Sequence, residues 1–462
     1  MKPSLPRRKS RMSFGDSDTI CAVATPPGRG GIGVIRVSGD LVKDVITALI
    51  GKDLKPRYAS HAPIYAEDGQ QLDDGIALYF PKPNSFTGED VLEIQGHGSP
   101  VVLDMILEAI CACGARIARP GEFSERAFLN DRIDLAQAEA IADIIDSGSR
   151  ESARAALRSL KGEFSRKINA IADEVIASRV FVESSIDFPE EEIDFLAESD
   201  IEKRIQKIAE MLDALLLTAR HGRLLRDGIN VVLAGTPNVG KSSLLNRLAG
   251  YDAAIVTEIA GTTRDILKEQ IDIDGMPVHI LDTAGIRESG DIVEQEGIKR
   301  TRQAIEDADL ILIMTESDSR NDLLLHEFID SGKPLQNLIL VRNKIDKIGK
   351  TPEITNFNGV TEVFISAKSG EGIELLNQTI KDKSGFSENR ETDIIARARH
   401  INALKSAKDY IENCLSCFAE DRKYELAAEE LRSAHNQLCN ITGEYSSDEL
   451  LGEIFSSFCI GK

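Results

Sequence analysis

The sequence predicts a multidomain protein that joins an α+β N-terminal domain, an α-helical domain and an inserted α/β domain. Its 462 residues exceed what one ordinary hydrophobic core accommodates. Changes in the apolar pattern divide the chain, and helical patterning returns after the inserted domain. Short runs broken by Pro and Gly give way near residue 135 to long Ala/Ile/Leu patterns, and these give way at residue 230 to alternating strands and helices.

The N-terminal domain is expected over residues 16–132. The runs TICAVATPPGRGG, IGVIRVSG and GIALYFPKPNSFTGED alternate apolar and polar residues between turn-forming ones, which indicates strands, turns and an occasional helix. The preceding residues 1–15 form a basic leader that we expect to be disordered. The start of an organelle transit peptide is the less favoured alternative, because the leader is short and lacks an amphipathic apolar stripe.

Helical patterning occupies two segments, residues 133–227 and residues 387–462. Stretches such as EKRIQKIAEMLDALLLTARHG and IIARARHINALKSAKDYIENCLSCF place apolar residues on one face of a helix. The economical interpretation is one helical domain interrupted by an insertion. The sequence does not establish that its two halves pack together.

The insertion is expected over residues 228–386. Apolar runs NVVLAG, VHILDT, LILIMT, LILVRNK and EVFIS alternate with the helical patterns KSSLLNRLAG and IELLNQTI. This alternation is typical of an α/β domain with a mainly parallel sheet.

The composition excludes several classes of protein. The formal net charge of -21 repels phosphate, which argues against a general nucleic-acid-coating protein, although a local basic patch or a partner can still recruit RNA. Seven scattered cysteines do not resemble the dense framework of a small secreted domain. No apolar run reaches the ~18 residues of a membrane-spanning helix, so we expect a cytoplasmic protein without a membrane span.

A phosphate-binding loop follows the first strand of the insertion. Gly235-x-x-x-x-Gly240-Lys241-Ser242 lies between the apolar run NVVLAG and a helical pattern, which is the context that this motif requires. Backbone N–H groups of such a loop surround the β-phosphate, the lysine reaches the β- and γ-phosphates, and the serine can hold Mg²⁺. The residues expected at the nucleotide are Asn238, Val239, Gly240, Lys241, Ser242 and Ser243.

Two further segments carry the features of nucleotide-sensing switches. Asp282 ends the run VHILDT, where a carboxylate reaches Mg²⁺ through water, and it is followed by Thr283, Ala284 and Gly285, whose glycine N–H can sense the γ-phosphate. In the upstream stretch GTTRD, Thr262 or Thr263 can contribute an oxygen to Mg²⁺. We favour Thr263.

The base is read by the motif Asn343-Lys344-Ile345-Asp346. The Asp346 carboxylate can accept hydrogen bonds from guanine N1–H and the exocyclic amine, which adenine does not offer, so the sequence predicts guanine selectivity. A supporting motif, Ser366-Ala367-Lys368, follows the run EVFIS and is expected to donate a backbone N–H to guanine O6.

One expected catalytic residue is missing. Ras-like GTPases place a water-orienting Gln directly after the second-switch glycine, and here that position is Ile286. Asn238 suggests a different device, because its side-chain oxygen can help to bind a monovalent cation beside the phosphates. Glu294 is the nearest plausible water-orienting carboxylate, although residue type alone would make it a solvated helix charge.

The flanking stretches carry a specific resemblance. They are TPPGRGGIGVIRVSG, FTGEDVLEIQGHG, RPGEFSERAFLNDRIDLAQAEAIADIID, IDFPEEEIDF, TEIAGTTRD and the terminal FSSFCIGK. With them the chain resembles the bacterial tRNA-modification GTPases called MnmE or TrmE, within the TrmE-Era-like GTPases. The resemblance implies a homodimer that acts with the FAD-dependent MnmG (GidA) as a heterotetramer. Its task would be to add an aminomethyl or carboxymethylaminomethyl group to C5 of the wobble uridine of certain tRNAs.

The resemblance also implies cofactors and their ligands. Hydrolysis would need K⁺, held by Asn238, Thr257, the Ile259 carbonyl and Thr262, with Mg²⁺ on Ser242 and Thr263 and with Glu294 orienting water. Glu258, Ala260 and Gly261 would complete the GTP contacts. A tetrahydrofolate one-carbon donor, in its 5-formyl or methylene form, would contact Arg36, Glu93, Arg132 and Lys462. Without the family, the first three would be surface charges.

Other signals have alternatives. Gly28 to Gly33 matches a dinucleotide fingerprint, but the following IGVIRVSG alternates like a strand, so we set that site aside. Cys459 is either a catalytic nucleophile or a contributor to folate-site geometry. The pairs Cys111/Cys113 and Cys414/Cys417 could suggest a metal site, but neither has a matched second pair, so we expect buried or half-buried thiols there. A ribosome-assembly switch of the Era or Der type shares the nucleotide motifs, and an interaction scaffold with residual hydrolysis is a third possibility.

Overall fold

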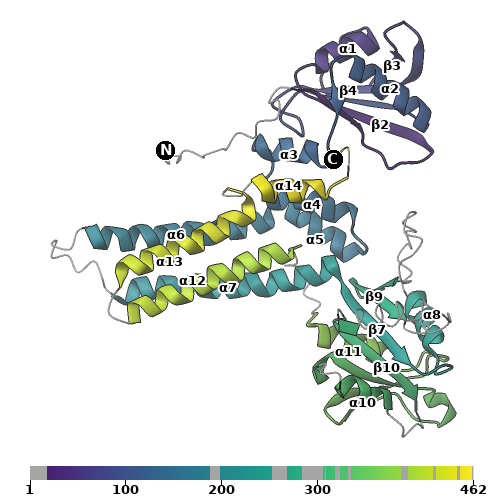
Figure 1. The fold of residues 1–462 in the computed structure, drawn as a ribbon, viewed down its shortest axis with the longest axis vertical. Helices are drawn as coiled ribbons and strands as arrows, with labels where there is room; N and C mark the ends of the chain where they lie inside the picture. Colours follow the sequence, from purple (N-terminus) through teal and green to yellow (C-terminus); the bar gives the residue numbers. More distant parts are fainter. Residues whose placement is uncertain are drawn as a thin grey trace, which may run out of the picture. The chain divides into compact units, whose positions relative to one another are not determined.

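The computed structural model describes residues 18–187, 198–251, 268–282, 305–306, 308–317, 323–330, 334–386, 394–419, 423–444, 448–459 and 461. The chain divides into two compact units (Figure 1). The first contains Met1–Ala142, Ser165–Phe195 and Ser416–Lys462, and the second contains Asp143–Phe164 and Leu196–Leu415. Each unit therefore combines segments that are far apart in the sequence. No helix among the described residues is long and apolar enough to cross a membrane.

A six-stranded sheet forms the N-terminal part of the first unit. Its strands are β1 (Ile20–Val23), β2 (Gly30–Ser38), β3 (Ser60–Tyr65), β4 (Gln71–Phe80), β5 (Val91–Gly98) and β6 (Arg116–Ile117), in the order β3-β4-β5-β2-β1-β6. Neighbours are antiparallel except β1 and β6. Helices α1 (Val42–Ile50) and α2 (Pro100–Ala112) pack against the sheet and share its core. The α+β prediction for this region is confirmed.

The Gly-rich run is part of a strand. Gly30 begins β2, which pairs with β5 from Gly30↔Gly98 to Ser38↔Val91. Gly98 must lack a side chain, because a Cβ there would lie 2.6 Å from the Gly30 carbonyl oxygen. The run therefore does not open a helix, as a dinucleotide site would require.

The helices of the first unit are α3 (Glu122–Leu129), α4 (Leu135–Ile145), α6 (Glu163–Asp187), α13 (Tyr424–Thr442) and α14 (Asp448–Ser456), although α4 and α6 begin or end in the second unit. Helix α14 buries Leu451, Ile454 and Phe455 in a cluster with Leu135 and Ala138 of α4. The C-terminal segment thus packs on an early part of the chain.

A seven-stranded sheet dominates the second unit. Its strands are β7 (Ile229–Gly235), β8 (Lys268–Ile273), β9 (Met276–Asp282), β10 (Leu310–Glu316), β11 (Leu338–Asn343), β12 (Ile354–Phe357) and β13 (Val360–Phe364), in the order β12-β13-β11-β10-β7-β9-β8. The edge strands β8 and β12 are antiparallel to their neighbours, and the five strands between them are parallel. The predicted parallel α/β domain is confirmed.

Both faces of this sheet are covered. In β10, Leu310, Leu312 and Met314 belong to one core, and Ile311 and Ile313 belong to a second core on the other face. The covering helices are α8 (Lys241–Tyr251), α10 (Leu323–Asp330) and α11 (Ile373–Ser384), and two 3-10 turns, η2 (Leu335–Asn337) and η3 (Ile345–Lys347), flank β11. Five consecutive apolar residues, Leu310 to Met314, fit a sheet buried on both faces.

The long helices of the second unit are α5 (Arg150–Leu160), α7 (Glu198–Asp227) and α12 (Ala398–Ala419). The Lys408 ammonium of α12 donates to Asp213 of α7 at 2.5 Å. Before α12, the Ile395 N–H donates to the Ser159 hydroxyl at 3.0 Å. The two helical halves of the sequence therefore pack together inside this unit, which the sequence left open.

Candidate guanine-nucleotide site and N-terminal pocket

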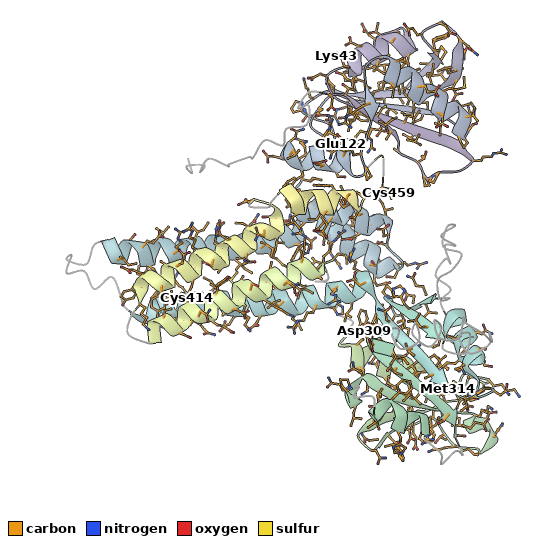
Figure 2. All side chains as sticks on the ribbon, viewed as in Figure 1. Lys43, Glu122, Asp309, Met314, Cys414 and Cys459 are labelled. Carbon is orange, nitrogen blue, oxygen red and sulfur yellow. The ribbon has the colours of Figure 1, made fainter. Side chains whose placement is uncertain are left out.

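Motifs far apart in the sequence gather at one edge of the parallel sheet. Because β7, β9, β10, β11 and β13 run in the same direction, their carboxyl ends lie at the same edge. Figure 2 marks the direction of β10 by Asp309, just before its first residue, and by Met314 near its carboxyl end. In register, Met314 pairs with Gly235, the first glycine of the phosphate loop. Ligands bind outside this edge in open α/β sheets.

The phosphate loop connects β7 to α8. Asn238 and Gly240 have positive φ angles of 62° and 108°, so the loop turns sharply before α8 begins at Lys241. The Lys241 side chain is buried, and its ammonium donates to the Gly235 carbonyl at 2.7 Å and to the Thr236 carbonyl at 3.3 Å. Ser242 and Ser243 are exposed in the first turn of α8. An ammonium and a helix N-terminus together favour an anion at this loop.

Asn343 joins the base motif to the phosphate loop. Its buried Nδ2 donates to the Val239 carbonyl at 2.8 Å, and its Oδ1 accepts from the Ala367 N–H at 2.9 Å. A Cβ at Gly240 would lie 2.4 Å from Asn343 Nδ2, so only glycine allows this approach. One side chain thus holds three predicted motifs together.

Lys344 makes a second connection to the same loop. Its ammonium donates to the Asn238 carbonyl at 2.8 Å and to the Glu316 carboxylate, and its own backbone is left-handed at φ 70°. The hydrogen bond from Lys344 holds the pKa of Glu316 below its ordinary value. Sequence reasoning missed Glu316, and the available signal was an acidic residue at the carboxyl end of the apolar run LILIMTE.

Asp346 is held by the supporting motif. The buried Ser366 hydroxyl donates to Asp346 Oδ1 at 2.7 Å and accepts from the Ser369 N–H at 3.2 Å. The Lys368 carbonyl accepts from Arg247 of α8 at 2.6 Å. The hydrogen bond from Ser366 fixes the Asp346 carboxylate, whose other acceptor positions stay available, and its contact with guanine stays a prediction.

Several predicted residues lie outside the described part of the chain. Asp282 ends β9 and pairs in register with Leu233 of β7, which places its backbone at the carboxyl edge beside the phosphate loop. The structure leaves undescribed Thr257, Glu258, Ile259, Ala260, Gly261, Thr262, Thr263, Thr283, Ala284, Gly285, Ile286, Glu294 and Lys462. Their roles stay predictions.

In the first unit, Arg36 and Glu93 form an ion pair across β2 and β5. They are register partners, and Arg36 Nη2 lies 2.8 Å from Glu93 Oε1. The guanidinium is also 5.7 Å from the ring centres of Phe86 and Phe123. Arg36 Nη1 donates to the Gly461 carbonyl at 3.5 Å, so the end of the chain lies at this pair.

Arg132 lines a cavity of about 610 Å³ in the same unit. The other lining residues are Arg57, Phe80, Asn84, Ser85 and Phe86. Phe86, which lines this cavity, also lies beside Arg36, so one aromatic ring borders both the cavity of Arg132 and the Arg36–Glu93 pair. Arg57 was not predicted, and its place in the short sequence KPRYA carries no motif that would have indicated it.

Cys459 is exposed, and its carbonyl accepts from the Gly121 N–H at 3.3 Å. Figure 2 labels it together with Glu122, the residue after Gly121. Burial raises the pKa of Glu122, but hydrogen bonds from Arg116 and the Arg119 N–H outweigh it and lower the pKa to about 2. The C-terminal segment therefore contacts the backbone beside a charged and hydrogen-bonded residue, Glu122.

The remaining cysteines are free thiols. Cys21, Cys414, Cys417 and Cys439 are buried and Cys111 and Cys113 are half-buried, which confirms the prediction for the pairs Cys111/Cys113 and Cys414/Cys417. Among the described residues, no group of three or more His, Cys, Asp and Glu side chains is arranged to hold a metal ion. The cysteine pairs thus carry no sign of a zinc site.

Comparisons with known proteins find two matching family models and several similar solved structures. Residues 19–132 match the family model described as the GTP-binding protein TrmE N-terminus, and residues 135–459 match the MnmE helical domain. Similar solved structures include the G domain of T. maritima FeoB (28% identity, 34% of this chain and 98% of that chain, TM-score 0.26). Another is Aquifex aeolicus Era bound to GDP.AlF4- (28% identity, 39% and 66%, TM-score 0.26).

A curated relative extends the match over almost the whole chain. The tRNA modification GTPase MnmE of Hydrogenovibrio crunogenus is 51% identical over 454 residues, which cover 98% of this chain and 100% of the relative. This chain therefore belongs to the MnmE family of tRNA modification GTPases, and it is an enzyme that binds and hydrolyses GTP.

Proposed function

We propose that this chain is a K⁺-stimulated GTPase that acts with the FAD-dependent MnmG on C5 of the wobble uridine of certain tRNAs. The product would carry an aminomethyl or carboxymethylaminomethyl group. The observation that carries the nucleotide part is the hydrogen bond from Lys344 to the Asn238 carbonyl, because it ties the base-reading motif to the loop residue expected at the cation. Family membership supports tRNA modification over the Era- or Der-type alternative.

The loop residues fit a cation beside the phosphates. The Asn238 backbone is left-handed and its carbonyl accepts from Lys344, so the backbone of this residue is held from outside the loop. Amide, hydroxyl and carbonyl oxygens are suitable ligands for a hard cation. In this proposal Asn238, Thr257, the Ile259 carbonyl and Thr262 hold K⁺, and Ser242 and Thr263 hold Mg²⁺. Bound K⁺ would supply positive charge where an arginine finger acts in other GTPases.

The remaining steps belong to the protein's own side chains. Lys241 neutralises charge on the β- and γ-phosphates, and Glu294 orients the attacking water. Asp346 fixes the base, so a nucleotide without the guanine N1–H and amine binds weakly. The Lys241 ammonium is already held at the loop by two backbone carbonyls, which reduces the entropy lost when it reaches a phosphate.

The N-terminal pocket fits a tetrahydrofolate one-carbon donor. Arg36, Glu93, Arg132 and Lys462 would hold it, in the 5-formyl or the methylene form. The half-buried Arg36–Glu93 pair offers both a cation and a carboxylate, which a pterin and its acidic tail require. Cys459 acts either as a nucleophile or by shaping this site. We further propose a homodimer, a heterotetramer with MnmG and a cytoplasmic location.

The first experiment measures the modified nucleosides of tRNA in cells that lack the gene. Loss of the C5 modification at the wobble uridine, restored by the wild-type gene, is the expected result. Unchanged nucleoside content would refute the proposal.

A second experiment tests the cation. Asn238→Ala is expected to remove K⁺ stimulation of GTP hydrolysis while GTP binding stays within about threefold of wild type, because backbone N–H groups and Lys241 still hold the phosphates. Asn358→Ala is the matched control, because Asn358 is an exposed asparagine of the same unit with a left-handed φ of 52°. Full K⁺ stimulation in Asn238→Ala would discard the cation site.

A further inference from the structure

We propose that the cavity lined by Arg57 and Arg132 binds the carboxylates of a polyglutamyl folate tail, and that Arg57 makes the site prefer long tails. This inference rests on the proposed folate function and extends it from the donor's identity to the length of its tail. Arg57 has no role in that proposal so far.

The charge of the lining indicates an anionic occupant. Two of the six lining residues are arginines and none is acidic. Among the described residues, no carboxylate pairs with either guanidinium. A cavity of about 610 Å³ is within the range of small-molecule sites. Phe80 and Phe86 add apolar wall, which suits an organic tail better than inorganic phosphate alone.

Arg57 is held in place at an energetic cost. Its φ of 59° is left-handed, a conformation that non-glycine residues rarely adopt. Its N–H donates to the Tyr79 carbonyl at 2.8 Å, and its guanidinium donates to the Asn84 carbonyl across the cavity lining. Such backbone strain persists where the surroundings impose it, and it concentrates at binding sites.

The position of Arg132 is also fixed by a left-handed backbone and a hydrogen bond. Asp131, directly before it, has a left-handed φ of 54°, and the Arg132 N–H donates to the Ala127 carbonyl at 2.8 Å. A Cβ at Gly88 would lie 3.3 Å from the Arg132 stem, so the stem runs close along this glycine. Two left-handed positions therefore present two guanidiniums to the same cavity.

One residue that lines the cavity also lies at the proposed pterin side. Phe86 lines the cavity and also lies 5.7 Å from the Arg36 guanidinium, which pairs with Glu93. A folate held at Arg36 and Glu93 would extend its tail past Phe86 toward Arg57 and Arg132. Each added glutamate brings one more carboxylate, and arginine binds carboxylates through two parallel hydrogen bonds. The solvent exposure of both arginines leaves an exit for a long tail.

The test compares ligands that differ only in tail length. Binding of 5-formyltetrahydrofolate with one or with five glutamates is measured on the full chain by isothermal titration, for wild type, Arg57→Gln and Arg57→Lys. Lys55→Gln is the matched control, because it removes the same charge from an exposed residue two positions away that does not line the cavity. Circular dichroism checks that each variant is folded.

The expected wild-type result is roughly tenfold tighter binding of the pentaglutamate, since a charge-assisted hydrogen-bond pair supplies an effect of that order. Arg57→Gln should abolish this ratio, Arg57→Lys should retain part of it, and Lys55→Gln should retain it fully. Higher salt should also reduce the wild-type ratio. If Arg57→Gln does not fold, the wild-type affinity ratio between the two tail lengths and its salt dependence test the tail site.

Three outcomes overturn the inference. Equal wild-type affinity for both tails refutes the tail site while leaving the folate proposal intact. A ratio that is unchanged in folded Arg57→Gln refutes the role of Arg57, and if this variant instead loses affinity for tRNA, the cavity takes RNA phosphate. Absence of binding by either folate would refute the folate proposal together with the inference.

Discussion

Replacing Asn343 with alanine tests whether one side chain holds the nucleotide site together. The change removes a donor to the Val239 carbonyl and an acceptor from the Ala367 N–H, at 2.8 and 2.9 Å. Val239 and Ala367 are 1% and 3% exposed, so water does not readily replace the lost partner. Each orphaned buried group costs about 1–3 kcal/mol, which gives about 2–6 kcal/mol for the pair.

The assay is urea unfolding of the full chain followed by circular dichroism, because the sequence contains no tryptophan. The unfolding transition whose midpoint rises in GDP belongs to the second unit, since a ligand stabilises only the unit that binds it. With a slope of about 2–3 kcal/mol per M, the Asn343→Ala midpoint should fall by roughly 0.7–3 M. GDP affinity should fall at least about tenfold, because the loop and the supporting motif lose their common anchor.

The control is Asn356→Ala, which removes an exposed side chain that accepts only from the Gly359 N–H at 2.9 Å. Water can replace that bond, so its midpoint should move by less than about 0.3 M. If the midpoint of Asn343→Ala also moves by less than about 0.3 M and its GDP affinity is unaltered, the two hydrogen bonds of Asn343 do not determine the geometry of the phosphate loop.

Three further predictions concern the first unit. The Asp73 carboxylate raises the pKa of His97 through a hydrogen bond at 2.7 Å. NMR titration should therefore place the pKa of His97 above about 6.5, and Asp73→Asn should return it to about 6.5. The contribution of this pair to the stability of the folded protein is full at pH below about 6.5, and it is lost as pH rises through the folded-state pKa of His97. Gly461→Ala should weaken 5-formyltetrahydrofolate binding about tenfold, because the φ of Gly461 is 94° and an added Cβ would lie 2.4 Å from the Val23 carbonyl oxygen. Unchanged affinity would show that the C-terminal segment does not contribute to the folate site. Cys459→Ser should remove the fastest-reacting thiol in a titration with a disulfide reagent, because Cys459 is the exposed cysteine; an unchanged fast phase would contradict that exposure.

Local pattern was sufficient to predict the elements of the nucleotide site. The run LILIMTE is apolar at nearly every position, and the structure buries it between two cores as β10. The motifs at Gly235, Asn343 and Ser366 each follow a parallel strand, so strand direction alone brings them to one edge. Glu316 was missed because its partner Lys344 is 28 residues away and no motif links them.

The N-terminal site was less accessible to sequence reasoning. Arg36 and Glu93 were expected from the family resemblance alone, since their residue types indicate only surface charges. Their pairing depends on the register of β2 with β5, because a slip of one strand by one residue would turn its side chains to the other face and separate the pair. Arg57 could not be predicted, because its cavity is formed by several separate loop and strand segments.

The sequence by itself determined the order of the domains, the class of each sheet and the identity of the guanine-nucleotide motifs, because periodicity and turn residues act over a few positions. Only the tertiary structure decided which distant groups meet. Lys344 reaches Asn238 across 106 positions, and Arg36 reaches Gly461 across 425. Such contacts depend on strand order and register, which follow from how all the apolar faces of a unit are buried together, and no local pattern encodes that result.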